Sequence, residues 1–187
     1  LFKGLDIYNQ KELIDNHLGK YPVINFSFKK VKAVKWEYAK RAFKEEIANE
    51  YIRHRYLLDG DKLLDFQKNN YKKIMSQQAE VFTYTSAIAD LSKFLKDYHG
   101  KEVIVLIDEY DTPLHYAKLN DYYKEMLDIM RALMVDGMKG NKNLEKGIVT
   151  GIMKISQESI FSAFNNPEIS TVVDGYCADM FGFTEKE

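Results

Sequence analysis

The fold is decided by one stretch, residues 103–111, which reads VIVLIDEYD. Five apolar residues follow one another from Val103 to Ile107 and end directly at Asp108 and Glu109. An unbroken apolar run of this length suits a strand covered on both faces, as in a parallel sheet. Ligands of such sheets gather at the carboxyl ends of the strands. The stretch therefore predicts a buried parallel strand with a ligand site at its end.

Strands and helices are expected to alternate around this stretch. Alternating apolar and polar residues after Pro22 predict a strand over 21–28, and a second strand is expected over about 144–151. Helical periodicity and capping residues predict helices over about 35–58, 61–78, 83–100 and from Asp121 onward, a short helix over 157–164 and a short strand near 171–173. This order indicates an α/β fold with a parallel sheet and right-handed crossovers.

Composition restricts the class of protein. The chain has 187 residues, with 27 basic and 28 acidic side chains and a net charge of −1, so no global basic field supports nucleic-acid binding. The single cysteine, Cys177, cannot form an internal disulfide and fits a reducing compartment, which favours a cytoplasmic location. No apolar run reaches transmembrane length, and residues 1–10 resemble neither a signal nor a transit peptide. We therefore expect no membrane partner.

The two consecutive acids carry the strongest chemical signal. Ionised carboxylates beside a core are unfavourable unless they are paired or bind a cation. Because successive strand residues point in opposite directions, Asp108 and Glu109 should have different tasks. Mg²⁺ takes few carboxylates together with waters and phosphate oxygens, which suits Asp108 as the metal ligand and leaves Glu109 to activate a water as general base. The alternative is a solvated polar turn after a strand.

Thr150 is the third candidate. It stands near the end of the strand expected over 144–151 and is followed by Gly151. In P-loop ATPases a polar residue on a neighbouring strand reaches the attacking water or the terminal phosphate, so Thr150 is interpreted as a nucleotide-sensing residue. Strand propensity followed by a turn would also explain a threonine at this position.

The motifs, taken in order, resemble a known family. They are YPVINFSF, VIVLIDEYDTPL, GIVTGIMKISQESIFSAFNN and MFGFTEKE, and together they span essentially the whole chain. The pattern closely resembles the AAA-ATPase-like family of bacteria and archaea, whose members are often fused to a PD-(D/E)XK nuclease-like domain. The resemblance implies an incomplete P-loop NTPase-type three-layer fold with a mainly parallel sheet and flanking helices.

The resemblance also implies roles for individual residues. Asp108 matches the magnesium-holding acid of the Walker B motif, Glu109 the catalytic acid and Thr150 the sensor position. It implies Mg²⁺ with ATP as cofactor and substrate of the full-length parent, and a homo-oligomer or a fused nuclease-like domain as partner. Positions that match the family pattern without a firm role are Asp111, Pro113, Ser156, Glu158 and Ser159, whereas Lys154 stands where the family often has Arg.

The phosphate-binding loop of such enzymes is missing from this sequence. Neither Gly19-Lys20 nor Gly100-Lys101 is followed by Ser or Thr, and neither is preceded by Gly five residues earlier. We therefore expect residues 1–187 to be one domain, the central part of an AAA-ATPase-like domain truncated at both ends, and nearly inactive alone. We also expect the strand of the missing loop between the Walker B strand and the Thr150 strand, where its absence would leave a gap or draw in another strand.

Two other functions remain open. The segment could be a protein-interaction module in which the acidic pair is the remnant of a nucleotide site. It could also be a metal nuclease that uses Asp108, Glu109 and Asp111, although the strand over 144–151 lacks the acid-x-Lys pair of that class. Two minor candidates are His115, more simply explained as a solvated loop histidine, and Arg131, a possible arginine finger that is more simply explained by a surface ion pair.

Overall fold

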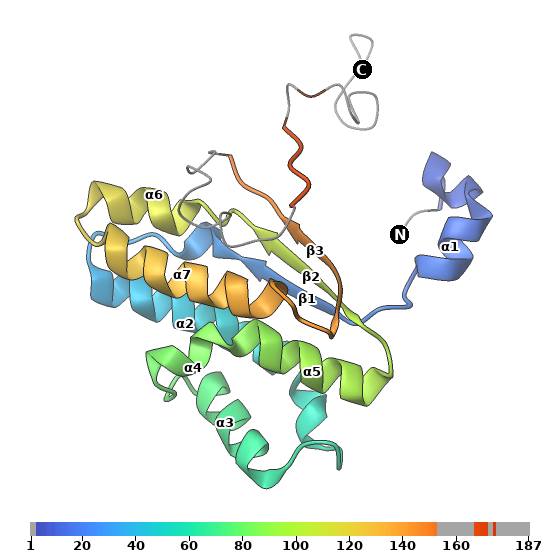
Figure 1. Cartoon of the computed structure of the whole chain (residues 1–187), viewed down its shortest axis with the longest axis horizontal. Helices are drawn as coiled ribbons and strands as arrows, with labels where there is room; N and C mark the ends of the chain where they lie inside the picture. Colours follow the sequence, from blue (N-terminus) through green and yellow to red (C-terminus); the bar gives the residue numbers. More distant parts are fainter. Residues whose placement is uncertain (1–2, 153–166, 172–173, 175–187) are drawn as a thin grey trace.

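The computed structural model describes residues 3–152, 167–171 and 174. Its parallel sheet has the order β1 (Val23–Ser27), β2 (Val103–Asp108) and β3 (Leu144–Val149), so the VIVLID strand is central (Figure 1). The expected α/β fold with a parallel sheet and flanking helices is therefore confirmed. The predicted helix over 157–164 and most of the predicted strand near 171–173 lie outside the described residues.

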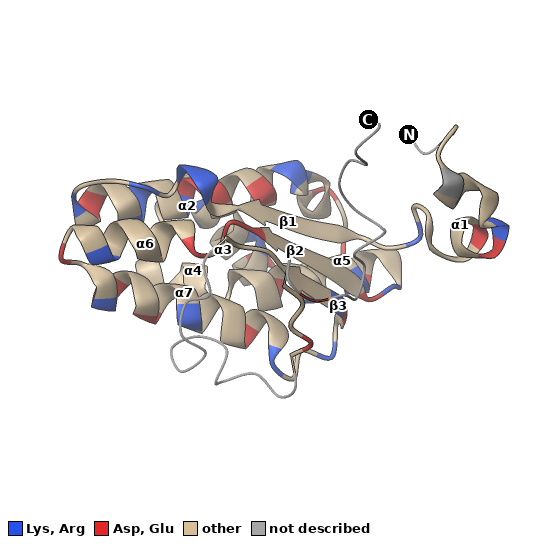
Figure 2. Cartoon of the chain, turned by 90° about the horizontal axis from the view of Figure 1, so that it is seen from above, with Lys and Arg blue, Asp and Glu red and all other residues tan. Residues whose placement is uncertain are grey.

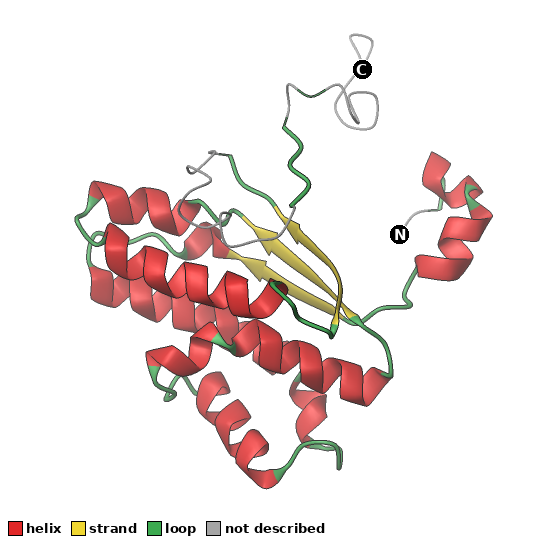
Figure 3. Cartoon of the chain, in the orientation of Figure 1, coloured by secondary structure: helices red, strands yellow, loops and turns green. Residues whose placement is uncertain are grey.

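The helices connect and flank the strands (Figure 3). Their bounds are α1 (Lys11–His17), α2 (Trp36–Arg53), α3 (Asp65–Met75), α4 (Val81–Thr85), α5 (Ala87–His99), α6 (Thr112–Leu119) and α7 (Tyr123–Met138). Short 3-10 turns are η1 (Asp6–Asn9), η2 (Phe28–Lys30) and η3 (Arg55–Leu58). Among the described residues, none of these helices is long and apolar enough to cross a membrane.

Helix α2 shows how the sequence pattern directs packing. Its apolar stripe at helical spacing is fully buried, comprising Ala39, Phe43, Ile47 and Tyr51. The helix predicted over 35–58 is interrupted after Arg53 and continues as η3. Helix α5 ends at the position predicted from Gly100. This glycine adopts the left-handed conformation that commonly ends helices, with φ of 67°.

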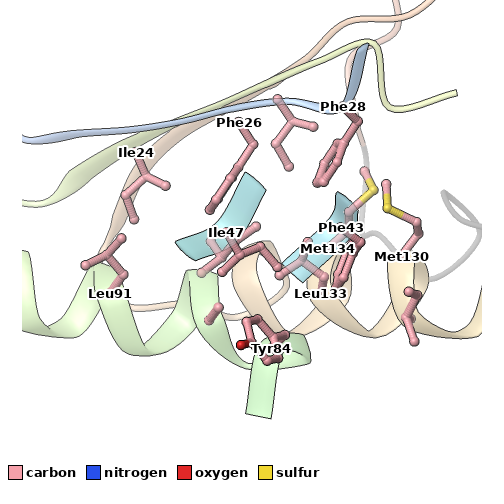
Figure 4. Packing of buried hydrophobic residues seen from close by; sticks show 14 of the residues in the cluster. Ile24, Phe26, Phe28, Phe43, Ile47, Tyr84, Leu91, Met130, Leu133 and Met134 are labelled. Atoms are coloured by element: carbon pink, nitrogen blue, oxygen red, sulfur yellow. The ribbon is translucent and has the colours of Figure 1, made fainter. Parts of the chain in front are cut away.

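The core lies between one face of the sheet and helices α2, α5 and α7. Figure 4 shows Phe26 and Phe28 above Phe43 and Ile47, with Met130 and Met134 of α7 closing one side. Figure 2 shows basic and acidic residues interspersed along the described helices rather than separated by sign. The interior is therefore apolar and the helical surface mixed in charge, as the near-neutral composition leads one to expect.

The opposite face of the sheet is more open than the sequence suggests. Burial alternates along β2, with Val103, Val105 and Ile107 buried but Ile104 and Leu106 only partly so. On β3, Ile148 is 45% exposed. Within the described residues, the helices that bury the central strand lie against one face, and the other face is only partly covered.

A second correction concerns strand order. β2 and β3 pair directly in parallel, with Leu106 opposite Ile148 and Ile107 opposite Val149. No gap and no inserted strand separates the acidic strand from the Thr150 strand. The intervening chain crosses over through α6 and α7 and returns to the neighbouring position, as a β-α-β connection does. The free edge of the described sheet is instead the outer side of β3.

The outer edge of β1 is closed by two glutamates of α2. The backbone N–H of Asn25 donates to Glu50 Oε1 at 2.8 Å, and that of Ser27 donates to Glu46 Oε1 at 2.8 Å. These carboxylates are one helical turn apart. They accept the hydrogen bonds that the carbonyl groups of a further strand would otherwise accept. An edge whose N–H groups are satisfied in this way is a poor template for strand addition.

Candidate functional site

The candidate site lies where β2 and β3 end. The backbone N–H of Thr150 donates to Ile107 O at 2.8 Å, and the N–H of Tyr110 donates to Thr150 O at 3.2 Å. The ladder between the strands thus continues past the last residue of β3. The residues that follow both strands are held beside one another at the edge where parallel sheets bind ligands.

Asp108 and Thr150 are brought together by this pairing. The Thr150 hydroxyl donates to Asp108 Oδ1 at 2.6 Å, although the two residues are 42 positions apart in the sequence. Both are exposed. Asp108 stands opposite Ser27 of β1, so it belongs to the open face of the sheet together with Ile104 and Leu106. Its carboxylate is therefore accessible to a ligand.

Glu109 leaves the strand by a turn. β2 ends at Asp108, and Glu109 has a φ of 52°, a left-handed conformation that is uncommon for a residue with a side chain. Its half-buried carboxylate accepts a hydrogen bond from the Thr112 hydroxyl at 3.1 Å, and Thr112 N–H donates to Glu109 O at 3.2 Å. Asp108 and Glu109 thus have different side-chain partners. The cause is the turn at Glu109 rather than the strand alternation expected from the sequence.

Asp111 fixes the loop that carries Thr150. Its side chain is buried, and Ile152 N–H donates to Asp111 Oδ2 at 3.0 Å. Gly151 passes close to the same turn, since a Cβ built there would lie 2.6 Å from Tyr110 Cε1 and 2.8 Å from Asp111 Oδ1. The sequence motif marked Asp111 only as a continuation of the acidic stretch. The sequence feature that could have identified this role is an acidic residue directly before the Thr-Pro pair that begins a helix.

The donor set fits a cation that is shared with a phosphate. Among the described residues, no group of three or more His, Cys, Asp or Glu side chains is placed to hold a metal ion. Asp108 offers one exposed carboxylate next to a hydroxyl, which matches the one or two carboxylates that Mg²⁺ takes when phosphates and waters complete its shell. Glu109 lies next to it in the chain without sharing its partner.

Two minor candidates, His115 and Arg131, lie on described helices. His115 is exposed on α6, where its backbone N–H donates to Asp111 O at 2.9 Å as part of the first helical turn. Arg131 is exposed on α7. Lys154, Ser156, Glu158 and Ser159 fall outside the described residues. The structure therefore brings together Asp108 and Thr150, with Glu109 beside them.

Comparison with known proteins places this chain in a family. The sequence profile described as "Predicted AAA-ATPase" matches residues 1–161, which include both strand ends and most of the chain. The chain belongs to the AAA-ATPase-like family. The α/β fold with neighbouring parallel strands is the kind on which a nucleotide site of this family would be built. No solved structure matches this AAA-ATPase-like chain.

A curated relative is similar over part of its length. It is described as "Uncharacterized protein in vnfD 5'region" from Azotobacter chroococcum mcd 1, and it is 32% identical over 89 residues. The aligned part covers 47% of the AAA-ATPase-like chain and 17% of the relative. The alignment therefore spans less than a fifth of the length of that relative.

Proposed function

We propose that this chain supplies the magnesium-holding and water-activating half of an ATP-hydrolysing site in a longer protein. The hydrogen bond of 2.6 Å between Thr150 and Asp108 carries the proposal, because it joins the ends of two adjacent parallel strands in a member of the AAA-ATPase-like family. Family membership supports nucleotide binding in general, and the residue roles below are the finer part of the proposal.

Asp108 would hold Mg²⁺, directly or through a water. The ion, bound together with ATP, would neutralise charge on the phosphate oxygens. Thr150 donates to one carboxylate oxygen and thereby orients Asp108, and the second oxygen remains available. From the same position the Thr150 hydroxyl is suited to sense the terminal phosphate.

Glu109 would accept the proton of the attacking water. Glu109 lies in a left-handed turn, and Thr112 holds one of its carboxylate oxygens. A base that is positioned in this way contributes about 10²- to 10⁴-fold to a rate. Dividing metal holding and proton transfer between two carboxylates keeps each available for its own task.

The phosphate clamp would come from another part of the parent protein. The sequence has no G-x-x-x-x-G-K-[ST] loop, and clamping and positioning supply most of the catalysis of phosphoryl transfer. Within the described residues, β3 has a neighbour on one side only, so its outer edge can take a further strand. We propose that residues 1–187 form one domain together with the part that carries the phosphate clamp. Without that part, residues 1–187 would be nearly inactive.

Metal-dependent nucleotide binding by the full-length parent tests this function. We expect Asp108→Asn to weaken ATP binding at least tenfold in the presence of Mg²⁺ and to have little effect in EDTA. Asp136→Asn, on the exposed side of α7, is the matched control and should leave both affinities unchanged. Equal ATP affinity of Asp108→Asn and the parent in Mg²⁺ would contradict the role of Asp108.

We also propose a location and partners for the parent protein. A single cysteine in the sequence suits the cytoplasm, and a homo-oligomer or a fused nuclease-like domain is the partner that the family resemblance implies. If the parent binds no ATP with or without Mg²⁺, the better account is an interaction module that retains the acidic pair as a remnant.

A further inference from the structure

A small cavity lies between helices, away from the strand ends. It has a volume of about 110 Å³ and is bordered by α2, α3, α4 and α5. Its apolar wall is largely aromatic and includes Tyr51, Phe66, Tyr71 and Phe94. Asp90 of α5 is the one ionisable carboxylate among the residues that line it. None of these residues takes part in the candidate nucleotide site.

The two tyrosines form the closed inner side of the cavity wall. Tyr51 and Tyr71 are buried, with ring centroids 4.5 Å apart. The Tyr51 hydroxyl donates to Ala87 O at 3.0 Å, and the Tyr71 hydroxyl donates to Tyr51 O at 2.9 Å. Their polar ends are therefore engaged by the backbone. The aromatic surface that a ligand can reach comes chiefly from Phe66, which is 61% exposed, and aromatic rings attract cations through their negative faces.

Asp90 has no cationic partner among the described residues. It accepts a hydrogen bond from the Ser86 hydroxyl at 3.0 Å. Lys93, one turn further along α5, instead pairs with Asp97 at 2.5 Å. The Asp90 side chain is open to solvent on one side. A ligand that enters the cavity can therefore reach a carboxylate whose charge is not already neutralised.

The charge of Asp90 affects the Tyr51 hydroxyl in the cavity wall. Burial raises the pKa of the Tyr51 hydroxyl, and the nearby negative charge of Asp90 raises that pKa further. Desolvation by the same surroundings raises the pKa of Asp90 itself, and this effect outweighs the Ser86 hydrogen bond and the charge of Lys93. A cation bound beside Asp90 would favour its charged form against this desolvation.

We propose that this cavity binds an organic cation with a short apolar stem, as carried by a lysine side chain or a free alkylamine. The aromatic wall would contact the stem and the face of the ammonium group, and Asp90 would pair with its charge. An engineered apolar cavity of about 150 Å³ accepts benzene, so a volume of about 110 Å³ suits a slightly smaller group.

Titration of this chain with n-butylammonium chloride, followed by chemical shifts of the backbone amides, tests the proposal. We expect saturable shifts on α3 and α5, and binding at least tenfold tighter than that of n-butanol, the neutral probe of similar shape. Asp90→Asn should weaken n-butylammonium at least fivefold and leave n-butanol unchanged. Asp136→Asn, on the exposed side of α7 and outside the cavity lining, is the matched control and should bind like the parent chain.

A second titration distinguishes the source of the cation. N-acetyl-lysine amide carries the same ammonium group on a protein-like backbone. Binding equal to that of n-butylammonium supports a lysine side chain as the natural ligand, whereas binding of n-butylammonium alone supports a free amine. The proposal is overturned if neither cation saturates, if n-butanol binds as tightly as n-butylammonium, or if Asp90→Asn binds the cation like the parent chain.

Discussion

Glu109 combines a costly backbone conformation with a position at the candidate site. Its φ of 52° belongs to the left-handed region, which costs roughly 1–2 kcal/mol for a residue with a Cβ. Such conformations persist where the surroundings impose them and are frequent at functional sites. Strand alternation does not predict this turn, because the conformation depends on how the chain passes from β2 into α6.

The strain at Glu109 predicts an unusual effect of glycine. Glu109→Gly should leave the free energy of unfolding unchanged or raise it by up to about 1 kcal/mol, because relief of strain exceeds the backbone entropy of about 0.5–1 kcal/mol. Glu125→Gly, in the first turn of α7, is the control and should lose about 1 kcal/mol. Urea denaturation measures both. Equal destabilisation by the two substitutions would show that Glu109 is not strained.

A glycine is required at position 151 because the Tyr110 and Asp111 side chains approach its backbone closely, and not because of its φ. An alanine Cβ at this position would lie 2.6 Å from Tyr110 Cε1 and 2.8 Å from Asp111 Oδ1. We expect Gly151→Ala to lower the free energy of unfolding by about 1–3 kcal/mol, as overpacking does. Gly147→Ala is the control on β3, where the nearest atom is the flexible Met138 Sδ at 3.3 Å. A loss as large for Gly147→Ala would remove the special role of Gly151.

At the scale of elements, the sequence predicted best where packing follows a simple period. The stripe of α2, the Gly100 end of α5 and the central strand all follow from apolar spacing and capping. Helix α6 was missed, because its eight residues are too few to display a full amphipathic repeat and they begin in the acidic turn. Helix α7 begins at Tyr123, and Asp121 lies before it with a φ of 58° instead of capping it.

The contact between α2 and β1 depends on the charge of Glu50. Burial alone would raise the pKa of Glu50, but hydrogen bonds from His54, Arg53 and the Asn25 N–H hold the pKa below its usual value of 4.5. The charged form therefore stabilises the folded state above about pH 4.5. This stabilisation is lost as the pH falls through the lower pKa of the folded state.

Replacement of Glu50 tests this pH dependence. Glu50→Gln should lose about 1–3 kcal/mol of unfolding free energy at pH 7, because hydrogen bonds to a buried carboxylate are weakened. The difference from the parent chain should shrink below pH 4.5 in urea denaturation. Glu37→Gln, whose side chain is 68% exposed in its pair with Lys40, is the control and should change stability by less than about 0.5 kcal/mol. A constant difference at all pH values would contradict the account.

At the scale of the whole molecule, the described chain is a sheet packed on one face. The apolar run of β2 predicted two covered faces, but run length cannot say whether the second cover is present in the same segment. Likewise, the sequence identified the strands of Asp108 and Thr150 but not their order, since adjacency depends on the crossover path. The candidate site residues were predicted from the acidic strand end and from motif resemblance, whereas the hydrogen bonds between them could be seen only in the fold.

The one-sided core predicts unequal costs for the two faces. Val105→Thr places a hydroxyl in a fully buried position and should lower the free energy of unfolding by about 1–3 kcal/mol. Ile148→Thr, at a position that is 45% exposed, should cost less than about 1 kcal/mol in this chain. Thermal or urea denaturation compares them. Equal losses would mean that the second face is covered in this chain as well.

We propose that Glu109 activates water beside a magnesium ion held by Asp108. The decisive measurement is single-turnover ATP hydrolysis by the full-length parent, with and without Glu109→Gln. We predict that Glu109→Gln binds ATP with Mg²⁺ normally but hydrolyses it at least about 100-fold more slowly, as expected for loss of a general base. Hydrolysis by Glu109→Gln at the parental rate would contradict it.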